Sequence, residues 1–138
     1  MKIRKAKSSE IKEIKKLVNN DEELNNLEET FSEDYYKRIL KKGILIVAVE
    51  EEKIVGVCFG TYNVKEKWAD LLILVVKEEF RNKGIGTSLV NEFETIAKNK
   101  KLNTIDLYAE KNSLHLFNKL KYQQGRTYTA FRKKINCN

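Results

Sequence analysis

An apolar run, a glycine-rich turn and an amphipathic helix pattern follow one another between residues 71 and 100, and this order limits the fold more than any other stretch. The apolar run, Leu71–Val76, is long enough for a buried strand. A polar loop, Lys77–Lys83, leads into Gly84-Ile85-Gly86. Apolar residues then recur on one helical face, at Ile85, Leu89, Val90, Phe93, Ile96 and Ala97. A glycine turn between a strand and a helix gathers free backbone N–H groups at the positive end of the helix dipole and therefore favours anion binding.

Two common anion-binding loops do not fit this turn. A dinucleotide-binding loop needs a third glycine where Leu89 stands, and a P-loop needs a lysine that is missing after Gly86. The remaining pattern is Arg81-x-x-Gly84-x-Gly86, with Lys83 as a further positive charge. Taken alone, two glycines at this spacing more often form a tight turn that only packs a helix on a sheet. The rest of the chain is therefore needed to distinguish such a turn from an anion-binding one.

Length and composition indicate one globular domain, 1–138. A chain of 138 residues can bury one core but is too short for two domains. It has no apolar run long enough to cross a bilayer, and its N-terminus turns charged at once, so we expect neither a membrane partner nor a secretory signal. Two cysteines and one histidine predict no disulfide framework and no metal site. We therefore expect a cytoplasmic protein.

Charge is distributed unevenly along the chain. Seven acids and no Lys or Arg lie between Asp21 and Asp34, so that the rest of the chain carries +14 although the whole carries +7. A basic body favours an anionic partner such as coenzyme A or nucleic acid, and an acidic segment favours a cationic one. Both features are also compatible with ordinary solvated surface.

Hydrophobic periodicity predicts the remaining elements. Ser8 or Ser9 can cap a first helix that runs to Val18, and Thr30 with Glu33 has the spacing of a capping box for a second. The strands predicted at 44–49 and 54–62 form a hairpin, and Gly56 and Gly60 within it predict a bulge or close packing. In all, we expect strands at 1–6, 44–49, 54–62, 68–76, 104–109 and 127–135, and helices at 8–18, 30–42, 84–100 and 112–119. This order predicts an α/β (α+β) fold with a single mixed sheet flanked by helices.

The motif and this element order together resemble the GNAT superfamily of acetyl-CoA-dependent N-acetyltransferases. The resemblance covers nearly the whole chain, because Val47-Ala48-Val49-Glu50 with Ile54-Val55-Gly56 looks like the superfamily's hairpin and Lys119-Leu120-Lys121-Tyr122 looks like the segment after its last helix. It implies a mainly antiparallel sheet. It also implies acetyl transfer from acetyl-CoA to an amine, by direct attack in a ternary complex, and the acidic segment favours a cationic amine.

The resemblance places acetyl-CoA where strand 68–76 splays from strand 104–109. It implies that the pantetheine arm pairs with backbone freed on the first strand, and that the pyrophosphate lies on the glycine turn beside Arg81. The asparagine that usually opens the last helix aligns with Glu110 unless Asn112 takes over. The residues implied in cofactor binding are Leu74, Val75, Val76, Arg81, Asn82, Lys83, Gly84, Ile85, Gly86, Thr87 and Asn112.

Asp70 is the candidate general base, because it precedes Gly84 by the spacing at which some members carry a catalytic glutamate. Asp70 and Leu74 have the same strand parity and are predicted to share a face, with the Leu74 N–H as oxyanion donor. Four residues span roughly 13 Å, so that Asp70 would act through water. Asp106 on the neighbouring strand is a weaker candidate, and either acid can instead be structural.

Phe117 stands where many members have a tyrosine that protonates the leaving thiolate, and phenylalanine cannot donate a proton. The alternative is therefore a GNAT-fold protein that binds acyl-CoA with little or no transfer. A nucleic-acid-binding domain is a less favoured class because no DNA- or RNA-reading motif is present. The sequence names neither the small-molecule or peptide amine acceptor nor the acyl-chain length, and it leaves open whether the protein is a monomer or a homodimer.

Overall fold

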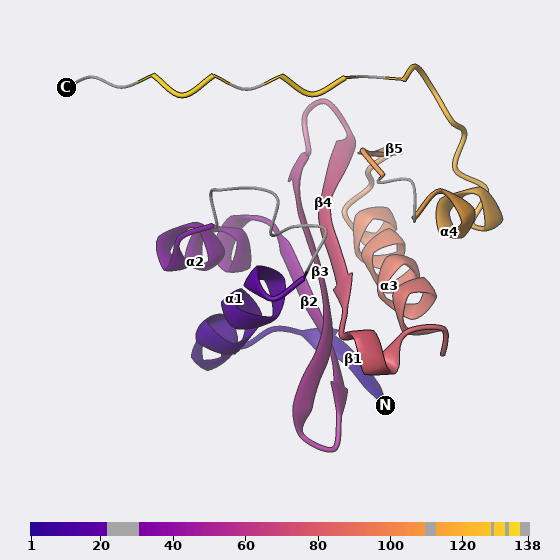
Figure 1. Cartoon of the computed structure of the whole chain (residues 1–138). Coiled ribbons are helices and arrows are strands. Elements are labelled where there is room, and N and C mark those ends of the chain that lie inside the picture. Colours follow the sequence, from indigo (N-terminus) through magenta and orange to yellow (C-terminus); the bar gives the residue numbers. More distant parts are fainter. Residues whose placement is uncertain (22–30, 110–112, 128, 132, 136–138) are drawn as a thin grey trace. The chain divides into compact units, whose positions relative to one another are not determined.

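The structure, a computed structural model, describes residues 1–21, 31–109, 113–127, 129–131 and 133–135, and the chain divides into two compact units (Figure 1). The first unit, Met1–Tyr108, holds the sheet. Its elements are β1 (Lys2–Lys5), the 3-10 turn η1 (Ser8–Glu10), α1 (Ile11–Asn19), α2 (Glu33–Lys42), β2 (Ile44–Glu50), β3 (Lys53–Asn63), β4 (Trp68–Val76), the 3-10 turn η2 (Glu78–Phe80), α3 (Ile85–Asn99) and β5 (Thr104–Leu107). The second unit, Ala109–Asn138, contains α4 (Leu114–Lys119).

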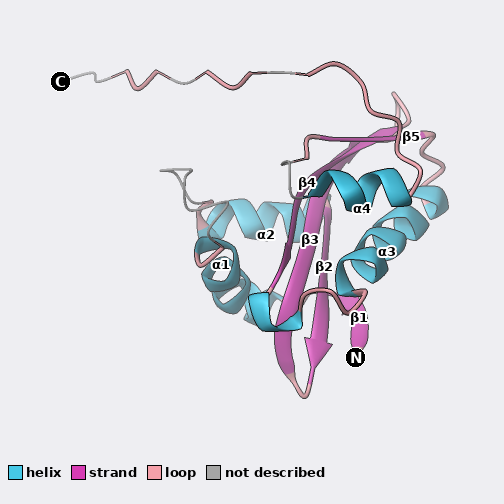
Figure 2. Ribbon diagram, turned by 45° about the vertical axis from the view of Figure 1, so that its right-hand side comes forward, coloured by secondary structure: helices cyan, strands magenta, loops and turns pink. Residues whose placement is uncertain are grey.

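Five strands form one mixed sheet in the order β1-β2-β3-β4-β5. The first four pair antiparallel, and β4 pairs with β5 in parallel. Helices α1 and α2 cover one face of the sheet and α3 covers the other (Figure 2). The predicted fold class, a mixed and mainly antiparallel sheet flanked by helices, is confirmed. Among the described residues, no helix is long and apolar enough to cross a membrane.

Each face of the sheet carries its own part of the core. On the α1/α2 face, Phe59 is fully buried and packs edge-on against Tyr36, with ring centroids 5.5 Å apart. On the other face α3 buries the stripe that periodicity predicted, Ile85, Leu89, Val90, Phe93 and Ala97. A β-carbon on Gly56 would already touch Leu89 and Ile85, which shows how closely α3 packs on β3.

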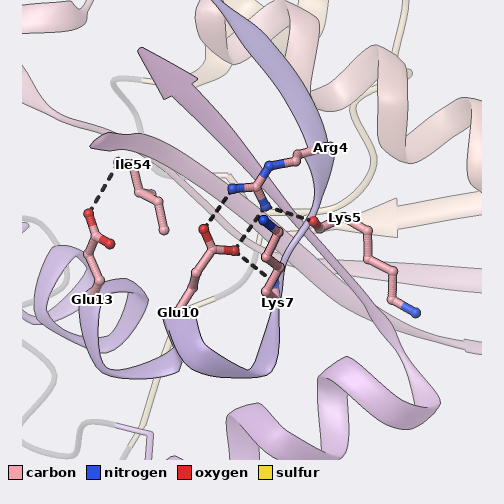
Figure 3. Close-up of polar contacts among 6 residues, drawn as sticks. All are labelled: Arg4, Lys5, Lys7, Glu10, Glu13 and Ile54. Atoms are coloured by element: carbon pink, nitrogen blue, oxygen red, sulfur yellow. Dashed lines mark hydrogen bonds and ion pairs between the residues drawn. The ribbon is translucent and has the colours of Figure 1, made fainter. Parts of the chain in front are cut away.

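The helix starts differ from the predicted ones. Neither Ser8 nor Ser9 caps α1, because both lie inside the 3-10 turn, and the Lys7 N–H instead donates to Glu10 Oε1 at 2.7 Å (Figure 3). Ser32 caps α2 by accepting from the Tyr35 N–H at 3.1 Å. The predicted cap Thr30 lies outside the described residues. Gly43 is the C-cap of α2, which ends at Lys42, where the predicted helix 30–42 also ends.

The predicted last strand, 127–135, does not form in the described part of that segment. The described residues there take no regular secondary structure, and Phe131 and Ile135 are 93% and 79% exposed. A segment with neither a partner strand nor a core to cover does not form a stable strand. The fifth predicted strand, 104–109, is real but ends at Leu107.

Candidate functional site

The β4 strand has a pairing partner on both sides for only half of its length. Trp68 to Leu71 pair with Thr104 to Leu107 of β5, and no described strand continues this pairing beyond Leu71. On the other side, β3 pairs with β4 as far as Val76. The last residues of β4 therefore present one open edge.

The hydrogen bonds show which β4 residues face that edge. The Lys77 N–H donates to the Val55 carbonyl of β3 at 2.8 Å, and polar groups alternate sides along a strand. The N–H and C=O groups of Val75 therefore point to β3, and those of Leu74 and Val76 point to the open edge. Of the three predicted backbone partners, Val75 offers no free backbone group, and its buried side chain faces α1 instead.

A bulge corrects the predicted relation between Asp70 and Leu74. Phe59 pairs with Ile73 and Gly60 pairs with Leu71, so Leu72 is an extra residue without a partner on β3. An extra residue reverses the alternation of side chains along the strand. Asp70 and Leu74 consequently lie on opposite faces of the sheet, and the prediction that they share a face is wrong.

Asp70 lies on the α1/α2 face. Its partner on β3 is Thr61, two residues from Phe59, which packs against α2 on that face. Its partner on β5 is Asp106, so two carboxylates stand side by side in register on neighbouring parallel strands. Burial, and next the nearby charge of Asp106, raise the pKa of the Asp70 carboxyl above its ordinary value. A raised pKa makes this carboxylate a stronger proton acceptor than a free one.

The glycine turn begins α3 with two residues in the left-handed conformation. Gly84 is the N-cap of α3 with φ +83°, a left-handed conformation that favours glycine, and Asn82 is also left-handed at φ 62°. The Ser88 N–H donates to the Gly84 carbonyl at 3.0 Å as the first bond of the helix. The N–H groups of residues 85–87 precede that bond and have no partner within the helix. No acid stands in the first turn of α3, and Gly84 provides no side-chain cap.

Arg81 joins this turn to the end of β4 and to the end of α1. Its Nε donates to the Val76 carbonyl at 3.0 Å, and its Nη2 lies 3.1 Å from Asp21 Oδ2. A cavity of about 480 Å³ adjoins this contact; it is lined by residues of α1 and the segment after it, by Ile54, by residues 75–79 and by Arg81. Glu13, in the same wall, accepts the Ile54 N–H at 3.2 Å and ties α1 to β3 (Figure 3).

An aromatic cluster lies on the same face as Asp70. It is formed by Phe31, Tyr35, Tyr36 and Phe59, with ring centroids of neighbouring members 4.5 to 6.2 Å apart. The Tyr36 hydroxyl is buried there without a hydrogen-bond partner among the described residues, and burial, followed by the influence of Tyr35, raises the pKa of Tyr36 to about 12. From the sequence, Tyr35 and Tyr36 could serve either packing or the acceptor site, because the resemblance implies that the early helices line that site.

Two predicted positions belong to the second unit. Phe117 of α4 is buried and packs edge-on against Tyr122, with ring centroids 5.5 Å apart. Asn112, the last predicted cofactor residue, lies outside the described residues. Most of the acidic segment, residues 22–30, also lies outside them.

Comparison with known proteins finds one matching family. The sequence model described as "Acetyltransferase (GNAT) family" matches residues 11–122. No curated protein matches the chain.

Several solved structures have a similar fold. A transcriptional regulator from Bacillus halodurans C-125 aligns with a TM-score of 0.79 and 20% identity, over 96% of this chain and 99% of that one. An acetyltransferase from Trypanosoma brucei aligns with a TM-score of 0.78 and 17% identity, over 96% and 99%. An aminoglycoside acetyltransferase from an uncultured soil metagenomic sample, in complex with trehalose, aligns with a TM-score of 0.77 and 18% identity, over 98% and 96%. At such identities the likeness shows the fold alone.

Proposed function

Because the chain belongs to the GNAT acetyltransferase family, we propose that it transfers the acetyl group of acetyl-CoA to an amine, with a cationic amine as the preferred acceptor. The family resemblance predicted from the sequence is confirmed by the match. The observation that carries the proposal is the open edge of β4 next to the uncapped N-terminus of α3. Together they offer unpaired backbone groups and an anion-binding turn within one short stretch of chain.

The residues present fit acetyl-CoA. The pyrophosphate suits the N–H groups of residues 85–87, because no acidic side chain in the first turn repels it and Gly84 carries no β-carbon to keep it away. The exposed Arg81 and Lys83 add positive charge beside them. The N–H and C=O groups of Leu74 and the N–H of Val76 at the open edge suit the amides of the pantetheine arm, whereas the Val76 carbonyl already accepts from Arg81 Nε.

Acetyl-CoA supplies a thioester carbonyl, and the neutral amine attacks its carbon in the ternary complex. The carbon–nitrogen bond forms and the carbon–sulfur bond breaks; the attacking nitrogen loses one proton, and coenzyme A leaves with the sulfur and receives that proton through water. In this proposal the Leu74 N–H at the open edge is the donor for the negative charge that develops on the carbonyl oxygen. Asp70, aided by Asp106, is the base that accepts the ammonium proton through water, and its raised pKa suits that role.

A cationic acceptor is supported by the charge of the chain. The seven acids between Asp21 and Asp34 raise the local concentration of cations, and the Asp70–Asp106 pair adds negative charge on the α1/α2 face. One structural neighbour is named as an aminoglycoside acetyltransferase, and another structure of it is described as a complex with sisomicin. A cytoplasmic location is part of the proposal, since the buried free thiol of Cys58 suits a reducing compartment.

The test is release of free coenzyme A from acetyl-CoA with a panel of amines at two salt concentrations. We expect release with cationic amines, such as polyamines, basic peptide termini and aminoglycosides, and less with neutral ones. The preference should weaken as salt rises, because the screening length is about 10 Å at 0.1 M. Equal release with cationic and neutral amines would remove the charge preference, and no release with any amine would remove the transferase proposal.

A second candidate function follows from Phe117, which has no proton to donate to a leaving thiolate. A GNAT-fold protein that holds acyl-CoA without efficient transfer would bind acetyl-CoA in calorimetry and release no coenzyme A with any amine. Calorimetry together with the amine panel therefore separates the two candidates.

A further inference from the structure

The Arg81 side chain is held at two points that are far apart in the sequence. Its Nε donates to the Val76 carbonyl, which points to the open edge of β4, and its Nη2 is paired with Asp21, 60 residues earlier. Asp21 follows directly after the end of α1, and Arg81 stands three residues before the N-cap of α3. The ion pair therefore connects the end of α1 with the turn that is proposed to bind the pyrophosphate.

The two partners are not equally fixed. The Asp21 side chain is only 9% exposed, whereas the Arg81 side chain is 48% exposed. A guanidinium has five N–H donors in one plane. The contacts with Val76 and Asp21 use two of them and set the orientation of the plane, and the other donors remain for an anion.

We propose that Asp21 is a positioning residue for Arg81, which it holds in the orientation that receives the pyrophosphate of acetyl-CoA. The inference rests on the proposed function. A free arginine would lose side-chain freedom when the anion binds, and a guanidinium already held at two points has less freedom to lose. Asp21 itself does not touch the cofactor in this proposal.

This positioning role predicts that loss of Asp21 changes the acetyl-CoA affinity in the direction opposite to the one that simple electrostatics predicts. Asp21 is a negative charge beside an anion-binding turn, so on charge alone its removal should tighten acetyl-CoA binding. If Asp21 positions Arg81, its removal weakens binding. The isosteric substitution Asp21→Asn removes the charge and leaves the shape, and Asp21→Glu keeps the carboxylate.

We expect Asp21→Asn to raise the calorimetric Kd and the KM for acetyl-CoA about three- to tenfold with kcat nearly unchanged, and Asp21→Glu to keep most of the affinity. The double mutant Asp21→Asn/Arg81→Ala tests whether Asp21 acts only through Arg81. A residue that acts only through Arg81 has no further effect once Arg81 is absent, so the double mutant should bind acetyl-CoA as Arg81→Ala alone does. Glu66→Gln, which removes an exposed acid in the loop between β3 and β4, is the matched control.

The outcomes separate this inference from the proposed function. Tighter or unchanged binding of acetyl-CoA in Asp21→Asn overturns the inference. An equal loss of affinity on Asp21→Asn whether Arg81 is present or replaced by alanine also overturns it, because it would indicate that Asp21 has a purely structural role. Thermal melting of each variant shows whether lost affinity is only lost folding. If the unmodified protein does not bind acetyl-CoA, the proposed function fails first and the inference fails with it.

Discussion

Asp70 and Asp106 are direct register partners where the parallel strands β4 and β5 run side by side. The pKa of Asp70 is raised, first by burial and then by the charge of Asp106. The folded protein therefore binds the Asp70 proton more tightly than the unfolded chain does. Stability from this carboxyl is present at low pH and is lost as the pH rises through the folded-state pKa, because an ionised Asp70 is partly desolvated and repelled.

Replacing Asp70 should therefore stabilise the protein at neutral pH. We expect Asp70→Asn to raise the Tm at about pH 7 and to change it little near pH 3, where the ordinary aspartate is largely protonated. In Asp106→Asn, the carboxyl pKa of Asp70, measured by NMR, should fall toward its ordinary value. Asp34→Asn is a control in which the Tm should fall instead of rise, because Asp34 lies in the first turn of α2, where an acid stabilises the helix. A lower Tm in Asp70→Asn at pH 7 would mean that the carboxylate has a stabilising partner.

Gly60 stands at the register shift between β3 and β4, beside the bulge that orients Asp70. A β-carbon at Gly60 would collide with the Asp70 carbonyl and would also press on the Phe93 ring at 3.0 Å. Because a backbone atom cannot move aside cheaply, Gly60→Ala should lower the free energy of unfolding by about 1–3 kcal/mol. Gly125→Ala is the control, because its β-carbon would meet nothing within 4 Å. Chemical denaturation of both variants tests this, and equal stabilities would show that β4 can shift freely at Asp70.

Hydrophobic periodicity was sufficient to predict the elements that bury a regular apolar stripe or that end in a turn. The apolar face of α3, the hairpin of β2 and β3, and the glycine turn between β4 and α3 were all visible in the residue pattern. The reason is physical: the stripe of α3 and the conformational freedom of Gly84 are local properties. The strand predicted at 127–135 shows the limit, because a strand needs a partner and the described residues of this segment pair with no strand.

The sequence could not show how the candidate site is assembled. The extra residue Leu72 reverses the side-chain alternation between Asp70 and Leu74, and nothing in an apolar run marks which of its residues bulges. The Arg81–Asp21 pair joins residues that are 60 positions apart, and Asp21 was one acid among seven in its segment. Such long-range pairing depends on tertiary packing and leaves no local signal.

The buried hydroxyl of Tyr36 should reduce stability. It lies in the aromatic cluster without a hydrogen-bond partner among the described residues, so the protein loses its hydration and gains no bond in return. We expect Tyr36→Phe to raise the free energy of unfolding by about 1 kcal/mol in urea titrations. Tyr35→Phe, at a partly exposed position, should change it by much less. A clear loss of stability in Tyr36→Phe would indicate that the hydroxyl is hydrogen-bonded in solution.

The glycine turn offers the most direct test of cofactor binding. Gly86 stands in the first turn of α3, where a glutamate side chain would lie beside the uncapped N–H groups and repel the pyrophosphate. An acid in the first turn favours a helix, so Gly86→Glu should leave the fold intact while calorimetric binding of acetyl-CoA disappears. Asn91→Glu is the matched control, because it adds the same charge on the exposed part of α3, about 7.5 Å further along the helix axis. Affinity retained in Gly86→Glu would exclude this turn as the pyrophosphate site, and affinity lost in both variants would mean that net charge, rather than the turn, governs binding.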